Sequence, residues 1–362
     1  MQVNGLFTAI RSRNLDVIRA LLEGNINIDS LSISNETPLH YAVKEGELEI
    51  IKLLIEYNAD INQANKYEYT PLFIAISRGH LEIVKLLIEH NADVNKAEKD
   101  GYTPLYKAAA QGYTSILKLL MEHNADVDQA NKYGKTPLYN AVQRGQLEIV
   151  KLLIEHKADV NKANKWGGTP LYIAAENENL EIVKLLIEHN AGVNKVDIHG
   201  YTPLYWAAEG GRLEIVKFLI EHNADVNRAN CYGWTPLYRA VKGGYFEIVK
   251  VLIEHTATVY AKTGEGKTIL DTAIETGNQE IMQLVKQAME IPWSPQRHYL
   301  YPPEVRKRIS TVMCLRMKST QLDRLPKDLL FIICKYIAER SRYTHTEYCE
   351  PVCKKQKRNV IK

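Results

Sequence analysis

A Thr-Pro-Leu tripeptide recurs along most of this chain at a fixed interval of 33 residues, with no insertion between any two copies. The copies begin at Thr37, Thr70, Thr103, Thr136, Thr169, Thr202 and Thr235. A unit of this length is too short to bury a core of its own, so each copy must stack on its neighbours. The period therefore predicts a solenoid of stacked repeats that exposes a long continuous surface.

The tripeptide itself predicts the start of a helix. In the third copy the Thr103 hydroxyl can cap the helix, and Pro104 occupies the first helical position, where its missing N–H has no cost. Ala108 and Ala109 follow, and such small side chains let a second helix approach closely. Each copy is therefore expected to begin with a short helix that packs tightly against its neighbour.

A second helix follows in each copy and is clearest over residues 81–90, LEIVKLLIEH. Val84, Leu87 and Ile88 recur at helical spacing and predict one apolar face. Asn91 then lies where the chain needs a left-handed residue to leave the helix.

The histidines that end this segment in six copies are expected to be helix-end residues. Equivalent positions on stacked helices lie about 8–10 Å apart, too far for two of them to share a metal ion.

This unit resembles the ankyrin repeat in its 33-residue period, its Thr-Pro-Leu-x-x-Ala motif, its helix-turn-helix pattern and its turn rich in Asn and Asp. The period extends backwards to Asn4-Gly5-Leu6 and forwards to Thr268. The resemblance implies an all-α ankyrin-repeat solenoid of about nine repeats over residues 1–290, with degenerate outer repeats as caps. It also implies a protein–protein interaction module that is not an enzyme and needs no cofactor.

Two departures from the family pattern predict local differences. The family's His after Thr-Pro-Leu, which links adjacent repeats by hydrogen bonds, is present only as His40, and aromatic residues replace it at Phe73, Tyr106, Tyr139, Tyr172, Tyr205 and Tyr238. A Tyr hydroxyl does not reproduce the geometry of two ring nitrogens, so we expect a different inter-repeat network. Glu68 and Glu178 stand where other copies have Gly, and those two turns are expected to differ from the rest.

The family's usual contact positions lie on the hairpins before Thr-Pro-Leu and on the first helices, along the concave side. Carried over to this chain, they are Tyr67, Tyr69, Tyr102, Tyr133, Trp166, Tyr201, Tyr232 and Trp234 on the hairpins, and Arg78, Arg144, Trp206 and Arg239 on the first helices. Lys66, Lys99, Lys132 and Lys165 lie beside them. Aromatic and Arg side chains dominate protein interfaces, so we expect a protein client here. Alternatively, these residues only cover the hairpin tips.

The charge of the chain is unevenly distributed. From Ile291 onward there are 16 Lys and Arg against 6 Asp and Glu, whereas the preceding residues carry 30 against 37. The negative balance of the array argues against nucleic acid as its ligand. The basic tail, residues 346–362, contains Lys354-Lys355-Gln356-Lys357-Arg358, which is similar to a nuclear-localisation patch and offers a third hypothesis, a nucleic-acid-associated regulator.

No pattern of catalytic or metal-binding residues is evident. The chain has no phosphate-binding loop, no nucleophile elbow and no His-Glu-x-x-His motif. His345, Cys349 and Cys353 offer three ligands, but a structural zinc site needs four, so no metal is predicted.

The five cysteines form no disulfide framework and favour a reducing compartment. Without a membrane-length apolar run or a signal segment, we expect a cytoplasmic or nuclear monomer.

Prolines at residues 291–302 predict a linker, and residues 303–345 predict a helical segment. Within it, a Leu-Pro followed by an acidic residue and an apolar helix is similar to the opening of an F-box, with docking positions Leu325, Pro326, Leu329, Ile332, Ile333 and Tyr336. Ankyrin arrays that end in a truncated F-box-like (PRANC-like) segment are the arrangement of poxvirus, algal-virus and some intracellular-bacterial proteins. The resemblance implies a Skp-type adaptor and a cullin ligase as partners in a host cytosol.

Two other interpretations of the segment 303–345 stay open. The Leu-Pro helix could be a cap that packs on the last repeat, in which case the protein is a scaffold or inhibitor. A cullin-binding SOCS box also combines two short helices with a Leu-Pro, but the helix around Cys314 lacks that family's Leu at the expected distance. The preferred hypothesis is a substrate receptor of a ubiquitin ligase.

Overall fold

The structure is a computed structural model that describes residues 2–24, 26–32 and 35–290. These residues belong to the first of two units, residues 1–292. They form eighteen α-helices and no strand, apart from a single β-bridge between Lys262 and Thr268. The predicted all-α solenoid of helix pairs is confirmed in this part of the chain.

The helices alternate between a first and a second helix of each repeat. The first helices are α1 (Gln2–Arg11), α3 (Pro38–Glu45), α5 (Pro71–Arg78), α7 (Pro104–Gln111), α9 (Pro137–Gln143), α11 (Pro170–Glu176), α13 (Pro203–Glu209), α15 (Pro236–Lys242) and α17 (Ile269–Thr276). The second helices are α2 (Leu15–Glu23), α4 (Leu48–Glu56), α6 (Leu81–Glu89), α8 (Thr114–Glu122), α10 (Leu147–Glu155), α12 (Leu180–Glu188), α14 (Leu213–Glu221), α16 (Phe246–Glu254) and α18 (Gln279–Glu290).

The Thr of each Thr-Pro-Leu motif caps a first helix, as the sequence predicts. In α7 the Thr103 side chain accepts a hydrogen bond from the backbone N–H of Tyr106, and Pro104 occupies the first turn. The same cap starts α3, α5, α9, α11, α13 and α15. Because the cap fixes the first residue of the helix, the 33-residue period fixes the same helix start in every inner repeat.

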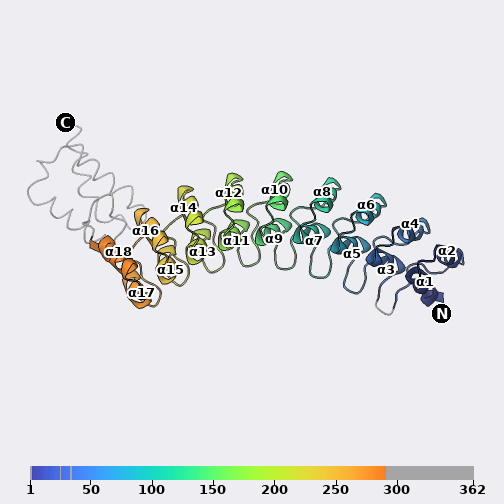
Figure 1. Ribbon diagram of the computed structural model, residues 1–362, viewed down its shortest axis with the longest axis horizontal. Coiled ribbons are helices and arrows are strands. Elements are labelled where there is room, and N and C mark those ends of the chain that lie inside the picture. The colour runs from blue at the N-terminus through green and yellow to red at the C-terminus, as the bar shows by residue number, and fades with distance from the viewer. Residues whose placement is uncertain (1, 25, 33–34, 291–362) are drawn as a thin grey trace, which may run out of the picture. The chain divides into compact units, whose positions relative to one another are not determined.

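Each inner first helix packs on its own second helix and on the first helices of both neighbouring repeats. Figure 1 shows the result within residues 2–290, where first helices lie in one row, second helices in another, and hairpin loops extend beyond the first row. Leu105, Ala108 and Ala109 of α7 are completely buried at these contacts. The core is therefore continuous along the array, and no repeat has a core of its own.

The second helices end as predicted. Asn91 after α6 has a φ of +64°, and Asn124, Asn190 and Asn223 take the same left-handed conformation after later helices. The preceding histidines are helix C-caps, and the Nδ1–H of His90 donates to the Leu86 carbonyl at 2.9 Å. His123, His156, His189, His222 and His255 repeat that contact.

The turns at Glu68 and Glu178 keep the left-handed backbone conformation of the glycine turns, so the predicted difference was wrong for the backbone conformation. Glu68 has a φ of +63° where the equivalent Gly101 has +82°, and Glu178 has a φ of +62° where the equivalent Gly145 has +68°. The Glu68 N–H donates to the Asn65 carbonyl at 2.8 Å, just as Gly101 closes the following hairpin. This hydrogen bond keeps the backbone conformation of the Glu68 hairpin, and both exposed glutamates adopt a left-handed conformation that glycine would adopt without strain.

A ladder of side-chain amides links consecutive repeats, and the sequence interpretation missed it. Asn62 accepts a hydrogen bond from the Asp93 N–H at 2.8 Å and donates one to the Asn91 carbonyl at 3.2 Å. Equivalent amides that bond in both directions are Asn95, Asn161, Asn194 and Asn227. Each amide satisfies one orphan carbonyl at a helix end and one N–H of the next repeat.

Asp128 interrupts this ladder and gives a first testable prediction. Its carboxylate accepts a hydrogen bond from the Asp159 N–H at 3.0 Å, but unlike the amides it has no N–H to donate to a backbone carbonyl of the next repeat. Burial raises the pKa of Asp128. Asp128→Asn supplies the missing donor, so it should raise the free energy of unfolding at pH 7 by about 0.5–1.5 kcal/mol. Urea unfolding of the purified chain measures this change.

The pH dependence provides the control for Asp128→Asn. Because the folded-state pKa of Asp128 is raised, folding favours the protonated acid, and the wild type loses stability as pH rises from about 3.9 through the folded pKa. The advantage of Asp128→Asn should therefore grow over that interval and stay constant above it. Asn95→Asp, which creates the same defect one repeat earlier, should destabilise; equal stability of all three proteins would contradict this explanation.

His40 is completely buried and is hydrogen-bonded through both ring nitrogens. Its Nε2–H donates to the Tyr69 carbonyl at 2.9 Å, and Nδ1 accepts from the Thr37 hydroxyl at 2.7 Å, so both nitrogens are used by the neutral ring. Burial lowers the pKa of His40, while its hydrogen bond to Tyr69 and the carboxylates of Glu36 and Asp60 oppose that shift. This contact joins the hairpin of one repeat to the next.

Acidification should weaken the His40 contact. With a folded-state pKa below the unfolded value of about 6.5, the neutral ring contributes full stability above pH 6.5, and this contribution is lost as pH falls through the folded pKa. His40→Tyr, the residue that most other repeats carry there, should remove this part of the pH dependence. Urea midpoints of both proteins between pH 5 and about 8 test it; parallel pH profiles would exclude His40 as the cause.

Candidate protein-binding surface

The hairpins before the first helices are joined edge to edge by backbone hydrogen bonds. Lys132 N–H donates to the Asp100 carbonyl at 2.9 Å, and Lys165 N–H donates to the Tyr133 carbonyl at 3.0 Å. The same bond joins Ile198 to Trp166, Cys231 to His199 and Gly264 to Tyr232. Side chains at equivalent positions of adjacent hairpins are therefore held in line along one ribbon.

An Asx turn presents two side chains from each hairpin. In the hairpin before α9, the Asn131 side chain accepts from the backbone N–H groups of Tyr133 and Lys135 at 2.9 and 3.0 Å. These two positions lie three residues and one residue before the capping Thr. The structure thus separates the predicted hairpin residues into two columns, which we name the tip column and the inner column.

The tip column contains the exposed aromatic residues. Tyr67, Tyr133, Trp166 and Tyr232 occupy the position three residues before Thr, with 52, 37, 48 and 48% of their surface exposed. Tyr133 and Trp166 come from adjacent hairpins, and their rings stack with centroids 6.2 Å apart and an interplanar angle of 18°. Four large aromatic side chains at hairpin tips are thus available to a partner.

A lysine lies over the ring of two of these tip aromatics. Lys66 Nζ lies 4.9 Å from the centre of the Tyr67 ring, and Lys132 Nζ lies 5.0 Å from that of Tyr133. Lys132 also forms a 2.6 Å ion pair with Asp100 of the preceding hairpin, and this hydrogen bond raises the pKa of Lys132. The tips therefore combine aromatic faces with positive charge.

The inner column is partly structural. Tyr69, Tyr102, Tyr201 and Trp234 occupy the position one residue before Thr and are half-buried. Each packs on the aromatic residue that replaces the family's His: Tyr69 on Phe73, Tyr102 on Tyr106, Tyr201 on Tyr205 and Trp234 on Tyr238, with centroids 4.7–5.9 Å apart. Burial raises the pKa of the Tyr106 and Tyr205 hydroxyls. Truncation of this column should therefore affect stability as well as binding.

The hydrogen bonding at the replaced His position differs from repeat to repeat, as expected. The Tyr139 hydroxyl accepts from the Asn164 side-chain amide of the next hairpin at 3.1 Å. In the repeat with His40, the ring instead contacts the Tyr69 backbone carbonyl. The aromatic replacements thus keep a link between repeats at Tyr139, while the hairpin ribbon and the amide ladder supply links along the whole inner array.

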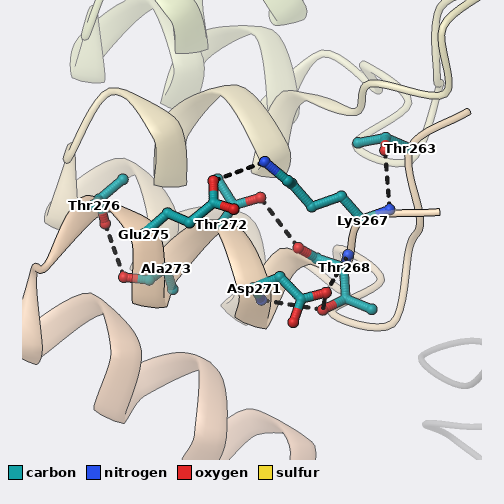
Figure 2. Close-up of polar contacts among 8 residues, drawn as sticks. All are labelled: Thr263, Lys267, Thr268, Asp271, Thr272, Ala273, Glu275 and Thr276. Atoms are coloured by element: carbon teal, nitrogen blue, oxygen red, sulfur yellow. Dashed lines mark hydrogen bonds and ion pairs between the residues drawn. The ribbon is translucent and has the colours of Figure 1, made fainter. Parts of the chain in front are cut away.

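The inner column is not aromatic throughout, because Lys135 and Gly168 occupy it in two middle repeats and Lys267 occupies it in the last repeat. Lys267 stands at this position, and its Nζ forms a 2.7 Å ion pair with Glu275 across α17, as Figure 2 shows. In the same view Thr268 and Asp271 form the reciprocal capping contacts that start α17. Polar pairs inside the repeat replace the stacked rings, so the aromatic surface ends with Trp234.

The predicted first-helix residues occupy two different settings. Arg78 and Arg144 are exposed near the ends of α5 and α9. Trp206, by contrast, contacts Tyr172 of the preceding repeat, with ring centroids 5.5 Å apart, and its Nε1 is buried with no partner among the described residues. Only the two arginines are therefore placed for contact without rearrangement.

Arg239 is engaged within the array. Its guanidinium pairs with Glu209 of the preceding repeat and lies 5.9 Å from the ring centres of both Tyr205 and Trp234. The sequence interpretation missed Glu209 and Tyr172 as members of this cluster. An acid 30 residues before the arginine, at nearly one repeat, was the available signal. Arg239 therefore supports the surface around Trp234.

Several predicted residues lie outside the described part of the chain. They include Leu325, Pro326, Leu329, Ile332, Ile333 and Tyr336 of the F-box-like segment, His345, Cys349 and Cys353, and the basic tail. Within residues 2–290 as described, there is no cluster of His, Cys, Asp and Glu side chains that could hold a metal ion. The same residues include no helix long and apolar enough to cross a membrane.

Comparison with known families agrees with the geometry. A family model described as ankyrin repeats in three copies matches residues 6–98, 94–164, 158–230 and 226–291, which together span most of the chain. A comparison with curated proteins finds no match. The stacked helix pairs, the hairpin ribbon and the family match indicate a protein–protein interaction module, and the chain belongs to the ankyrin-repeat family.

Proposed function

We propose that this protein is a substrate receptor that holds a client protein on its hairpin tips and recruits a Skp/cullin-type ubiquitin ligase through residues 303–345. Client binding is supported by the tip column, where four aromatic side chains are exposed on consecutive or nearby hairpins: Tyr67, Tyr133, Trp166 and Tyr232. Exposed aromatic side chains on a fixed scaffold are the residues in which binding energy is usually concentrated.

The hairpin ribbon favours this function because it pre-organises the contact residues. Backbone bonds of 2.9–3.0 Å hold Lys132, Lys165 and Ile198 against the preceding hairpin. The Asx turns fix the backbone on both sides of each tip. The hairpins are therefore already ordered before a partner binds, which reduces the entropic cost of association.

The ligase part of the proposal depends on the sequence after the array. Leu325 and Pro326 are followed by Leu329, Ile332, Ile333 and Tyr336 at helical spacing. A helix with this pattern has one apolar stripe and suits docking to an adaptor protein. The 16 basic residues against 6 acidic ones from Ile291 onward distinguish this region from the acidic array.

A pair of full-length double variants separates the two halves of the function. Leu325→Ala with Ile333→Ala should abolish co-purification of a Skp-type adaptor and cullin, while the client is still captured. Tyr133→Ala with Trp166→Ala should abolish capture of the client, while the Skp-type adaptor and cullin still co-purify. Quantitative affinity purification of both variants and the wild type measures these outcomes.

Thermal unfolding of the Leu325 and Ile333 variant tests the alternative that the segment caps the array. A docking helix predicts a nearly unchanged melting temperature. A cap predicts a loss of about 2–5 kcal/mol for each buried side chain that is truncated. Absence of ligase subunits from the wild-type complex, in cells that contain them, would exclude the receptor and leave an ankyrin scaffold or inhibitor.

A further inference from the structure

The hairpin face of three adjacent repeats is positively charged although the array as a whole is negative. We define this basic segment as the hairpins and first helices at residues 65–79, 98–112 and 131–145. It contains seven Lys and Arg against three Asp and Glu, whereas all residues before Ile291 carry 30 against 37. The sign of the charge is thus reversed where the exposed tips Tyr67 and Tyr133 stand.

Three of these seven cations are available to a ligand without loss of an existing side-chain contact. Arg78 and Lys99 are exposed, Lys107 is half-exposed, and none of the three takes part in an ion pair with another described residue. Lys165, exposed at the next hairpin beside Trp166, is likewise without an acidic partner there. Of the three acids in the basic segment, Glu98 is buried and its side chain accepts two backbone N–H groups of its own hairpin.

Acidic residues bound the basic segment on its C-terminal side. The next hairpin and first helix, residues 164–178, carry Glu176 and Glu178 against Lys165. The following one, residues 197–211, carries Asp197 and Glu209 and no Lys or Arg. A uniformly charged polyanion that ran on along the hairpins would be repelled here. The positive surface therefore fits a short anionic segment.

We propose that the client docks on the hairpins between Tyr67 and Trp166 through an acidic protein segment that also carries apolar or aromatic side chains. Its carboxylates face Lys99 and Lys165, and its apolar groups contact the stacked Tyr133 and Trp166 rings. This inference rests on the proposed client-binding function and adds the chemical class of the partner. Charge complementarity selects the partner, and the aromatic tips hold it.

Selection of random peptides on the full-length protein tests the charge of the partner. A displayed library of peptides about 16 residues long, enough to span several repeats in extended form, is selected on the wild type. Peptides that bind the Tyr133→Ala, Trp166→Ala double variant are removed first. This variant keeps all lysines and the basic C-terminal region, so the step removes peptides that bind without the aromatic tips. The surviving peptides depend on the aromatic tips, and their net charge is the first measurement.

We expect the survivors to be net negative and to carry aromatic or aliphatic residues. A selected peptide should bind Lys99→Glu with Lys165→Glu about tenfold more weakly than the wild type, since each reversal replaces attraction by repulsion. The matched control is Lys118→Glu with Lys151→Glu, which reverses two exposed lysines on the second helices α8 and α10 of nearby repeats. This control variant should bind the selected peptide with the same affinity as the wild type at about 0.15 M salt.

Three results would overturn the inference in distinguishable ways. Neutral or basic survivors would show that the tips bind a partner of different chemistry and would leave the client-binding function intact. A single-stranded oligonucleotide that displaces the peptides, and loses affinity with Lys99→Glu and Lys165→Glu, would identify nucleic acid as the ligand. An empty selection would contradict client binding on the tip column itself.

Discussion

Leu138→Ala should lower the free energy of unfolding of the array by about 2–5 kcal/mol. Leu138 is completely buried in α9, where that helix contacts α7, α10 and α11. Because the core is shared between repeats, a cavity at this position weakens two interfaces between repeats as well as the packing inside one repeat. Urea unfolding monitored by circular dichroism measures the loss.

Ile198→Ala is the matched control for Leu138→Ala. Ile198 lies at a hairpin tip with 61% of its surface exposed, so its truncation should change stability by no more than about 0.5 kcal/mol. Similar losses for the two variants would contradict a fold held by stacked first helices. A loss confined to Leu138→Ala agrees with the continuous core.

Tyr133→Ala or Trp166→Ala should weaken client binding by more than about 1 kcal/mol, with the larger effect expected for the more exposed Trp166. Both rings are exposed at adjacent tips and stack on each other, so a partner can contact both faces of the pair. Stability should change little, because the truncations remove the stacking contact, worth about 0.5–1.5 kcal/mol, and for Tyr133 also the Lys132 contact at the exposed tip. Titration of client against each variant and against the double variant measures the coupling between the rings.

Tyr69→Ala gives the contrast that separates binding from folding. Tyr69 is half-buried and stacks on Phe73 at 5.0 Å, so its loss should lower stability more than the loss of Tyr133. A client that binds the tip column should tolerate this change better than the loss of Trp166. Full affinity after loss of both Tyr133 and Trp166 would move the site away from the hairpin tips.

The repeat architecture could be predicted from the sequence because local and periodic signals agree. Thr103 and Pro104 define a helix start by local chemistry alone, and the period places the same start in each copy. The apolar positions Val84 and Leu87 are both completely buried. His90 and Asn91 end α6 through the local geometry of a helix terminus.

The division of the predicted contact residues into two columns could not be predicted. Tyr67 and Tyr69 are two residues apart in the same hairpin, and residue type does not show that one is exposed while the other packs on Phe73. The conformation of the Asx turn decides this. Likewise, Arg78 and Arg239 are both arginines of first helices, but only Arg239 meets an acid from the preceding repeat.

The amide ladder was missed although its signal recurs at 33-residue intervals. Asn62 and Asn95 resemble ordinary turn residues, and their role depends on the distance to the next repeat, which the sequence of one copy does not contain. The opposite error concerned Glu68. A non-glycine residue at a left-handed position was expected to change the turn, whereas its hydrogen bond to Asn65 keeps the turn unchanged.

Site-specific photo-crosslinking tests the location of the client most directly. A photoreactive phenylalanine analogue in place of Tyr133 in the full-length protein should form a covalent adduct with the bound client. The same analogue in place of Lys118, exposed on the second helix α8, should form none. An adduct at position 118 without one at position 133 would contradict binding on the hairpin tips.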